Sequence, residues 1–192
     1  MIKVFQATES ELGYVETILS TIAEAAKKRG TGIACRTTKY ITEKILEGKA
    51  IIAIEERTGT FAGFCYIESW EGKKFVANSG LIVAPEFQGH GLAKRIKKEA
   101  FDLSRKQYPN SKLFGLTTGL AVMKINSSLG YRPVPFSELP DDDAFWNGCK
   151  TCVNYDILMR TNRKHCLCTG MLYDHTKKKS KVLETLKKLK KK

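Results

Sequence analysis

The segment of residues 78–100, NSGLIVAPEFQGHGLAKRIKKEA, restricts what the whole chain can fold into. An apolar stretch typical of a β-strand ends at Pro85 and is followed by two glycines, Gly89 and Gly91, and then by a helix with many basic residues. A strand, a glycine turn and a helix in this order leave unpaired backbone N–H groups at the helix start, where the helix dipole also attracts anions. We therefore expect this turn to bind a phosphate group.

Two common phosphate-binding motifs do not fit this turn. A Walker loop requires Lys and then Ser or Thr after its last glycine, whereas Leu92 and Ala93 follow Gly91. A dinucleotide-binding turn requires a small residue where Lys94 stands and a parallel β-α-β unit at the start of the domain, but two hairpin-like strands come first. A plainer interpretation, in which the glycines only form a turn before the helix, stays open.

Apolar periodicity predicts the other helices and strands. A capping box at Thr8 and Glu11 begins a helix that ends at Gly30, and a second helix over residues 38–48 buries Ile41, Ile45 and Leu46. The predicted strands cover residues 2–5, 50–56, 61–69, 75–83, 113–117 and 152–158, and a further helix covers residues 120–130. The order β, α, α, β, β, β, α, β, α, β indicates an α/β (α+β) fold with a mixed, largely antiparallel sheet and flanking helices.

Length and charge predict one domain and a basic tail. The chain has 192 residues, of which 42% are hydrophobic, so it can bury one core. Its net charge is +13, and residues 177–192 hold nine lysines against one acid. We expect a single domain over residues 1–176, with a cysteine-rich segment at 145–170, and a lysine-rich tail at 177–192. Because no leader and no long apolar run is present, we expect a cytoplasmic protein without a membrane partner.

Six cysteines raise the question of metal binding. A structural zinc site would use two close pairs of thiols, a pattern that four cysteines near the C-terminus follow: Cys149, Cys152, Cys166 and Cys168. The second pair is CxC rather than the more specific CxxC, so buried or free thiols remain the alternative. Cys35 and Cys65 lie in apolar surroundings and are expected in the core.

The stretch LIVAPEFQGHGLA resembles the central signature of the GNAT superfamily of N-acetyltransferases, with Gln88, Gly91 and Ala93 at the three defining positions. The resemblance covers residues 2–158 and implies a sheet whose central strand pair splays apart. It also implies acetyl-CoA or succinyl-CoA as acyl donor, with the pyrophosphate at the glycines. The coenzyme-binding residues that it implies are Leu81, Ile82, Val83, Gln88, Gly89, His90, Gly91, Leu92, Ala93 and Asn126.

A second stretch, AVMKINSSLGYRPV, is similar to the helix that ends the superfamily's coenzyme site. Many members of the superfamily carry a tyrosine four residues before the glycine, where it protonates the departing thiolate. This chain has Asn126 there, and an amide cannot act as an acid, although it can hydrogen-bond the coenzyme. We expect Tyr131 to be a core aromatic residue, and we expect His90 to face solvent or phosphate.

The resemblance implies attack of an amine on a thioester, so a proton acceptor is required. Glu68 is the predicted base because it ends a central strand beside the expected cleft, and Asn78 and Ser79 could orient substrate. Arg36 and Lys39 favour an acidic acceptor.

The stretches ANSGLIV, FGLTTGLAVMKINSSLGY and FWNGCKTCVNYDIL look like short single-domain acyltransferases linked to bacterial arginine biosynthesis, which implies glutamate as the acceptor. The expected partners are thus coenzyme A and a small amine, with a homodimer left open and nucleic acid not expected. Two alternatives remain, acylation of protein lysines or N-termini, and a non-enzymatic nucleic-acid-binding module that uses the cysteines and the lysine tail.

Overall fold

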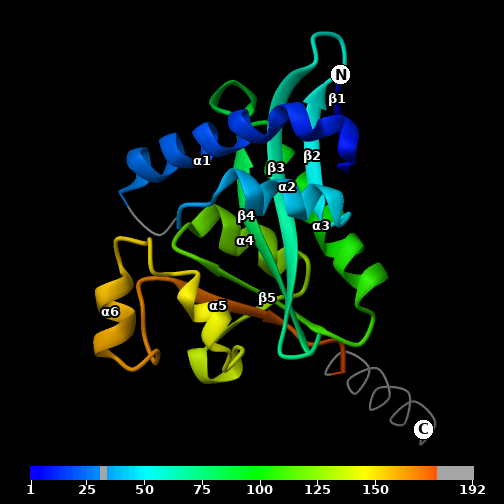
Figure 1. The fold of residues 1–192 in the computed structure, drawn as a ribbon. Coiled ribbons are helices and arrows are strands. Elements are labelled where there is room, and N and C mark those ends of the chain that lie inside the picture. Colours follow the sequence, from blue (N-terminus) through cyan, green and yellow to red (C-terminus); the bar gives the residue numbers. More distant parts are fainter. Residues whose placement is uncertain (31–33, 177–192) are drawn as a thin grey trace, which may run out of the picture.

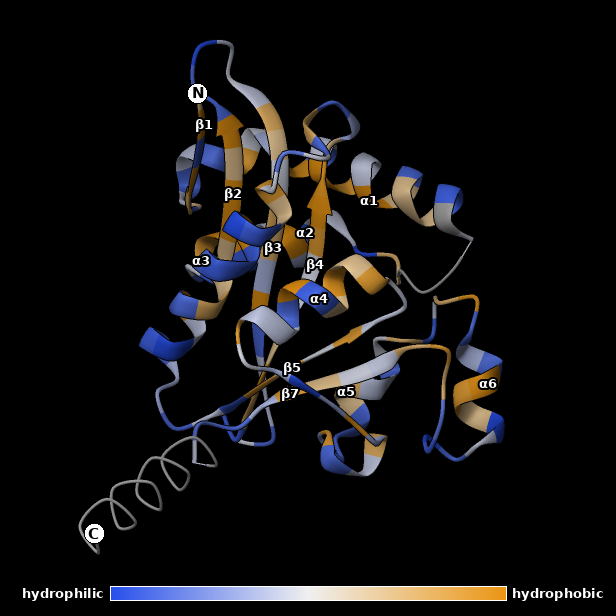
Figure 2. Cartoon of the chain, turned by 180° about the vertical axis from the view of Figure 1, so that it is seen from behind, coloured by the Kyte–Doolittle hydropathy of each residue, from blue (hydrophilic) through white to orange (hydrophobic). Residues whose placement is uncertain are grey.

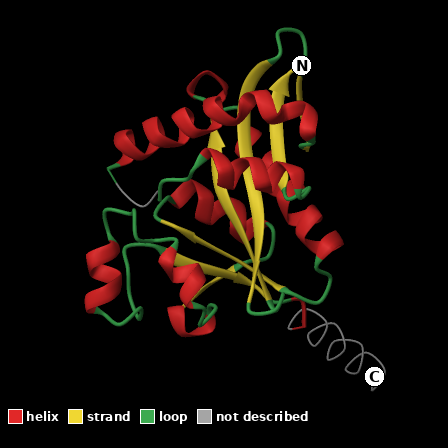
Figure 3. Ribbon diagram, viewed as in Figure 1, coloured by secondary structure: helices red, strands yellow, loops and turns green. Residues whose placement is uncertain are grey.

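The computed structural model describes residues 1–30 and 34–176 and shows one sheet covered by helices on both faces (Figures 1 and 3). The strands are β1 (Ile2–Gln6), β2 (Ala50–Glu55), β3 (Thr60–Trp70), β4 (Phe75–Val83), β5 (Lys112–Thr117), β6 (Arg132–Val134) and β7 (Thr169–Tyr173). The α-helices are α1 (Val15–Arg29), α2 (Thr38–Leu46), α3 (Leu92–Gln107), α4 (Leu120–Ser128), α5 (Asp143–Asn147) and α6 (Tyr155–Arg160). Short 3-10 helices cover Glu9–Tyr14, Pro85–Phe87 and Phe136–Glu138.

The seven strands lie in the order β1-β2-β3-β4-β5-β7-β6. Every neighbouring pair is antiparallel except β4 and β5, which are parallel. The predicted mixed, largely antiparallel sheet is therefore confirmed. Among the described helices, none is both long and apolar enough to cross a membrane.

The prediction of the last strand was wrong. Residues 152–154 form a turn, residues 155–158 belong to helix α6, and the last described strand is β7, at residues 169–173. A short apolar run such as YDIL can be a strand or one face of a helix, and periodicity alone does not separate them. In the structure Tyr155 and Leu158, three residues apart, pack against the same apolar cluster, which is the one-sided burial of a helix on a core. Strand β6 and helix α5 were not predicted, and Leu46 is exposed rather than buried.

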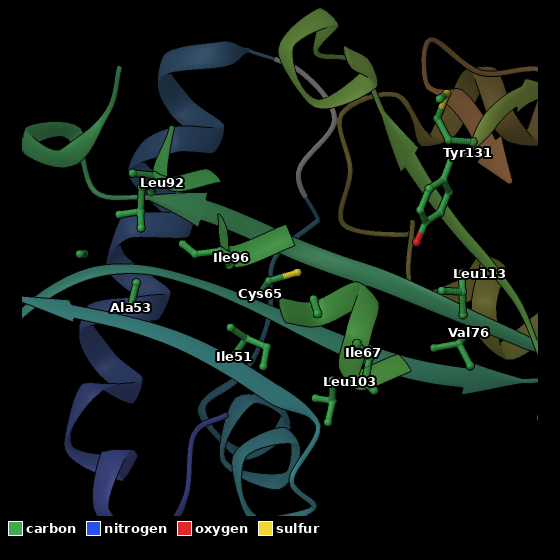
Figure 4. Close-up of a cluster of buried hydrophobic side chains, with 14 residues drawn as sticks. Ile51, Ala53, Cys65, Ile67, Val76, Leu92, Ile96, Leu103, Leu113 and Tyr131 are labelled. Carbon is green, nitrogen blue, oxygen red and sulfur yellow. The ribbon is translucent and has the colours of Figure 1, made fainter. Parts of the chain in front are cut away.

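The two faces of the sheet carry separate apolar cores. Helices α1 and α2 cover one face, where Ile18, Ile22, Ile41 and Ile45 pack against side chains such as Phe64. Helix α3 covers the other face, and its buried stripe meets β2, β3 and β4; Figure 4 shows these side chains, among them Ile51, Cys65, Ile67, Leu92, Ile96 and Leu103. Seen from that side, α3 turns a hydrophilic surface outward (Figure 2). Because successive side chains of a strand point to opposite faces of the sheet, the same strands contribute residues to both cores.

The pairing of β4 with β5 stops early. Only Phe75–Ala77 of β4 pairs with Lys112–Phe114 of β5, although both strands continue. Beyond that point the two strands diverge (Figure 1). On its other side β4 stays paired with β3, through a bulge near Gly80, whose φ is +65°. The predicted splayed central pair is therefore present.

Gly63 fixes how closely α3 approaches β3, and this generates a prediction about stability. An added Cβ at Gly63 would lie 2.6 Å from Cδ1 of Ile96 and 2.7 Å from the carbonyl oxygen of Ile82. Gly63→Ala should therefore lower the free energy of unfolding, measured in urea, by about 1–3 kcal/mol. Gly13→Ala is the control, because its added Cβ meets no atom within 4 Å. Equal stability of the two variants would contradict this packing.

Candidate active site

A cavity of about 450 Å³ lies where β4 and β5 separate. Segments far apart in the sequence line it. The strands contribute Tyr66 and Glu68 of β3, residues 78–82 of β4 and residues 115–118 at the end of β5. The helices and loops contribute residues 34–37, Tyr40 of α2, Lys97 of α3, Val122 and Asn126 of α4, and residues of the α5–α6 region. Because strand side chains alternate, Tyr66 and Glu68 reach the cavity from the α2 face of the sheet, whereas Lys97 belongs to the α3 face. The cavity thus joins both faces through the opening.

Glu68 lies in the cavity wall and is tied to α2. Its Oε2 lies 2.5 Å from Nζ of Lys44 and accepts a hydrogen bond from the Tyr40 hydroxyl at 3.1 Å. Its Oε1 lies 3.9 Å from Nζ of Lys49. The side chain is 14% exposed, so the carboxylate is held in one orientation and still reaches the cavity. Sequence reasoning placed Glu68 here but did not foresee its ion pair with Lys44.

Arg36 lies on the same side of the cavity. Its Nε donates to the hydroxyl of Tyr66 at 2.7 Å, and its Nη1 donates to the carbonyls of Ala34 and Cys35. Burial opposes the charge of the guanidinium, but the contact with Tyr66 leaves its pKa above the ordinary value. Within residues 1–30 and 34–176, no carboxylate forms an ion pair with Arg36. The cavity therefore has a fixed positive charge in its wall.

The side of β4 that faces away from β3 carries the backbone groups expected to contact the coenzyme. The N–H of Ala84 donates to Ala62 of β3 at 3.0 Å, so alternation turns the backbone groups of Val83 and Leu81 toward the opening. Nε2 of Gln88 donates to the carbonyl oxygen of Val83 at 2.9 Å. Ile82 differs, because its backbone pairs with Phe64. Gln88 thus braces the turn against the strand that precedes it.

The glycine turn has the conformation expected of an anion site. Gly89 and Gly91 have φ of +85° and +74°, and Gly91 is the N-cap of α3 without a side-chain hydrogen bond to the first turn. The N–H groups of Leu92 and Ala93 therefore lack helical acceptors. His90 is exposed and Leu92 packs into the core. This turn fits a pyrophosphate, since added Cβ atoms at Gly89 and Gly91 would point into open space that a ligand can use.

Asn78 and Ser79 begin the unpaired part of β4. The Asn78 side chain is fully used inside the protein: Nδ2 donates to Oγ of Ser104 at 2.7 Å, and Oδ1 accepts from the hydroxyl of Tyr131 at 2.9 Å. Any role of Asn78 in orienting substrate therefore falls to its backbone. Ser79 is half-buried and lines the cavity. Tyr131 is 4% exposed, which confirms that it is a core residue.

Asn126 is 1% exposed and lines the cavity from α4. Its Oδ1 is buried and has no hydrogen-bond partner among the described residues. A buried acceptor without a partner costs free energy, and a ligand that donates a hydrogen bond removes that cost. Asn126 therefore suits a coenzyme that carries amide N–H groups.

Lys97 was missed by the sequence analysis. It is 2% exposed, and its Nζ lies 3.4 Å from the carbonyl oxygen of Asn78. Burial lowers its pKa to about 8, while the nearby thiol of Cys65 acts in the opposite direction. The spacing gave a weak indication of burial, because Lys97 lies next to Ile96 of the apolar stripe and seven residues before the buried Ser104. Because Lys97 stands in a run of basic residues, the sequence favoured a solvent-exposed position instead.

The predicted zinc site is not supported. Within the described ranges, no group of three or more His, Cys, Asp or Glu side chains could hold a metal ion. Burial and the neighbouring thiols raise the pKa of Cys149 to about 11 and that of Cys168 to about 12. All four cysteines of the segment are free and line the cavity beside an apolar cluster. Cys65 is buried as expected, whereas Cys35 is exposed.

Known structures resemble this fold at low sequence identity. N-acetylglutamate synthase from Neisseria gonorrhoeae, solved with coenzyme A and N-acetyl-glutamate, has a TM-score of 0.62 and 16% identity over 90% of this chain and 34% of its own. Rv2747 from Mycobacterium tuberculosis, solved with CoA and NLQ, has a TM-score of 0.64 and 14% identity over 90% of this chain and 98% of its own. For yncA from Salmonella typhimurium, solved with acetyl-CoA, the TM-score is 0.61 and the identity is 14%, over 91% of this chain and 94% of its own.

These likenesses establish the fold. This chain spans about a third of the length of the Neisseria synthase. A comparison with curated protein sequences gives no significant match. The sequence model of the acetyltransferase (GNAT) family matches residues 19–121, more than half of the chain. Fold, glycine turn and family match agree, and the chain belongs to the GNAT family of acetyltransferases.

Proposed function

We propose that this N-acetyltransferase moves an acetyl or succinyl group from coenzyme A to the amine of an acidic amino acid, with glutamate as the leading acceptor. The observation that carries the choice of acceptor is Arg36, a half-buried guanidinium in the cavity wall that no described carboxylate neutralises. Tyr66 and two backbone carbonyls use Nε and Nη1 and hold the guanidinium in place, which leaves Nη2 to donate to a carboxylate.

A structural neighbour supports the same acceptor. The Neisseria protein of similar fold is an N-acetylglutamate synthase, and its structure contains N-acetyl-glutamate. At 16% identity this likeness supports glutamate without identifying it.

The two faces of the sheet suggest how the reactants meet. On the α3 face, the glycine turn, backbone groups of Leu81, the N–H of Val83 and the side chain of Asn126 would hold coenzyme A. On the α2 face, the acceptor would lie between Arg36 and Glu68. Its amine would then reach the thioester through the opening between β4 and β5, and backbone N–H groups of β4 would stabilise the developing oxyanion.

Glu68 is the proposed acceptor of the amine's proton, directly or through one water. Lys44 lies 2.5 Å from its carboxylate and, together with the Tyr40 hydroxyl, holds it in one orientation at the cavity wall. Glu47 shares that lysine at 3.2 Å from the outer side.

We also propose that residues 1–176 act as one catalytic domain, because the cavity is lined by residues from Ile22 to Cys168. The predicted lysine-rich tail, residues 177–192, lies outside the described residues.

The first prediction concerns the glycine turn. Gly91→Val would strain a backbone with φ of +74° and place a side chain where the pyrophosphate is expected. Affinity for acetyl-CoA, measured by calorimetry, should fall by about tenfold or more. Gly72→Val is the control, since Gly72 has φ of +60°, an equally open surrounding and a place in the β3–β4 hairpin. Unchanged affinity in a folded Gly91→Val protein would contradict the proposed coenzyme site.

The second prediction concerns the acceptor. A screen of amino acids and amines with acetyl-CoA and succinyl-CoA, read by released thiol, should show the highest activity with acidic amino acids. Arg36→Gln should lower kcat/KM for the best acidic acceptor by about 10-fold to 150-fold, the value of one charge-assisted hydrogen bond. Lys39→Gln, which removes an exposed charge of α2, should leave it nearly unchanged. A strong preference for neutral or cationic amines would exclude glutamate.

The third prediction concerns Glu68. Glu68→Gln should lower turnover by about 10²-fold to 10⁴-fold at neutral pH and leave coenzyme affinity unchanged. The rate relative to that of the wild type should rise with pH, because more of the amine then arrives without its proton. Glu47→Gln is the matched control, since it removes the other carboxylate that contacts Lys44 and Lys49 but does not line the cavity. A loss relative to the wild type that is the same at every pH would assign Glu68 to substrate binding instead.

A further inference from the structure

Lys97 is a buried amine inside the coenzyme side of the cavity. It reaches the cavity from α3 and has no ion-pair partner among the described residues, although charged groups are rarely buried unless they are paired. Its polar contact is the carbonyl oxygen of Asn78, 3.4 Å away, at the residue where β4 loses β5. Packing does not require an amine at this position, since α3 otherwise buries apolar side chains and Ser104 there.

The groups around Lys97 are neutral near pH 8. The titratable side chains that face it are the Cys65 thiol of β3 and the phenol of Tyr131, whose ring centroid lies 5.5 Å from Nζ. Burial raises the pKa of Cys65 to about 11 and holds that of Tyr131 well above its usual value. Lys97 is therefore the group in this part of the cavity that gains or loses a proton near neutral pH.

The side chains that helix α4 contributes to the cavity cannot protonate the leaving sulfur of coenzyme A. The sulfur of coenzyme A leaves as a thiolate, and the side chain that α4 offers is Asn126, an amide that cannot act as an acid. Its unpartnered Oδ1 accepts hydrogen bonds and gives no proton. An acid that serves the leaving sulfur must come from another element that lines the cavity.

We propose that Lys97 donates a proton to the sulfur of coenzyme A as the acyl group is transferred. The bond between the acyl carbon and the amine nitrogen forms, the carbon–sulfur bond breaks, and the electron pair of that bond stays on sulfur. The sulfur takes a proton from the Lys97 ammonium, the nitrogen's surplus proton leaves to Glu68 or water, and cavity water reprotonates Lys97. This assignment rests on the proposed acyltransferase function.

The titration of Lys97 determines whether the reaction rate rises or falls with pH. With a pKa of about 8, Lys97 is protonated and competent below that pH and loses its proton as pH rises through it. Its acidity is also close to that of an ordinary thiol, about 8.5, which favours proton transfer between them. The wild-type rate should therefore fall on the alkaline side of about pH 8.

Lys97→Met tests the proposal, because it keeps the length of the side chain and removes the amine. The variant should fold, since it replaces a buried amine by an apolar group. Turnover should fall by about 10²-fold to 10⁴-fold at pH 7 and the alkaline decline should disappear, while acetyl-CoA affinity by calorimetry stays within about threefold. Lys98→Met is the control on the same helix, where the lysine is exposed and pairs with Asp102.

A second readout needs no acceptor. The thiol of bound coenzyme A, followed by the ultraviolet absorbance of its thiolate, should titrate about one to three pH units higher in Lys97→Met than in the wild type, because the nearby positive charge is gone. Equal thiol titration in the two proteins, with coenzyme bound to both, would overturn the role of Lys97. Failure of both proteins to bind coenzyme A would instead overturn the proposed function.

Discussion

Beyond Ala77, strand β4 has no ladder partner on the side of β5. Backbone polar groups at the centre of a sheet must find other acceptors and donors, because burying them unpaired is costly. Two side chains supply part of this need, the amide of Gln88 at Val83 and the amine of Lys97 at Asn78. The remaining groups face the cavity, so the same interruption both creates the binding space and equips it with hydrogen-bonding groups for a thioester.

The two faces of the sheet bring different polar side chains to the cavity. Residues that alternate along β3 point to opposite faces, so Cys65 lies with α3 whereas Tyr66 and Glu68 lie with α2. The ion pair of Lys44 and Glu68 belongs to one face, and the unpaired Lys97 to the other. Two lysines of similar burial thus have different electrostatic surroundings, because Lys44 meets a carboxylate, whereas Lys97 meets a carbonyl, an aromatic ring and a thiol among the described residues.

Sequence could predict features that depend on local signals. The left-handed Gly89 and Gly91, the capping of the first helix and the stripe of α3 follow from residue type and spacing, and the structure contains them. Features that depend on tertiary packing were missed or wrong. The burial of Lys97, the ion pair of Glu68 and the helical state of residues 155–160 are decided by neighbours distant in sequence. The cysteine spacing suggested zinc, and the four thiols do lie near one another, but no group of side chains among the described residues has the arrangement of a metal site.

Strand β7 lies between β5 and β6, although it is the last described strand of the chain. During synthesis β5 and β6 therefore emerge from the ribosome long before the strand that pairs with both, and until then the edge of β5 stays open to other chains. The segment that lines the cavity with cysteines is the same one that delays this closure. A nascent chain that stops before residue 169 would hence lack β7 and leave the edges of β5 and β6 without their common partner, a site at which strands of other chains can pair.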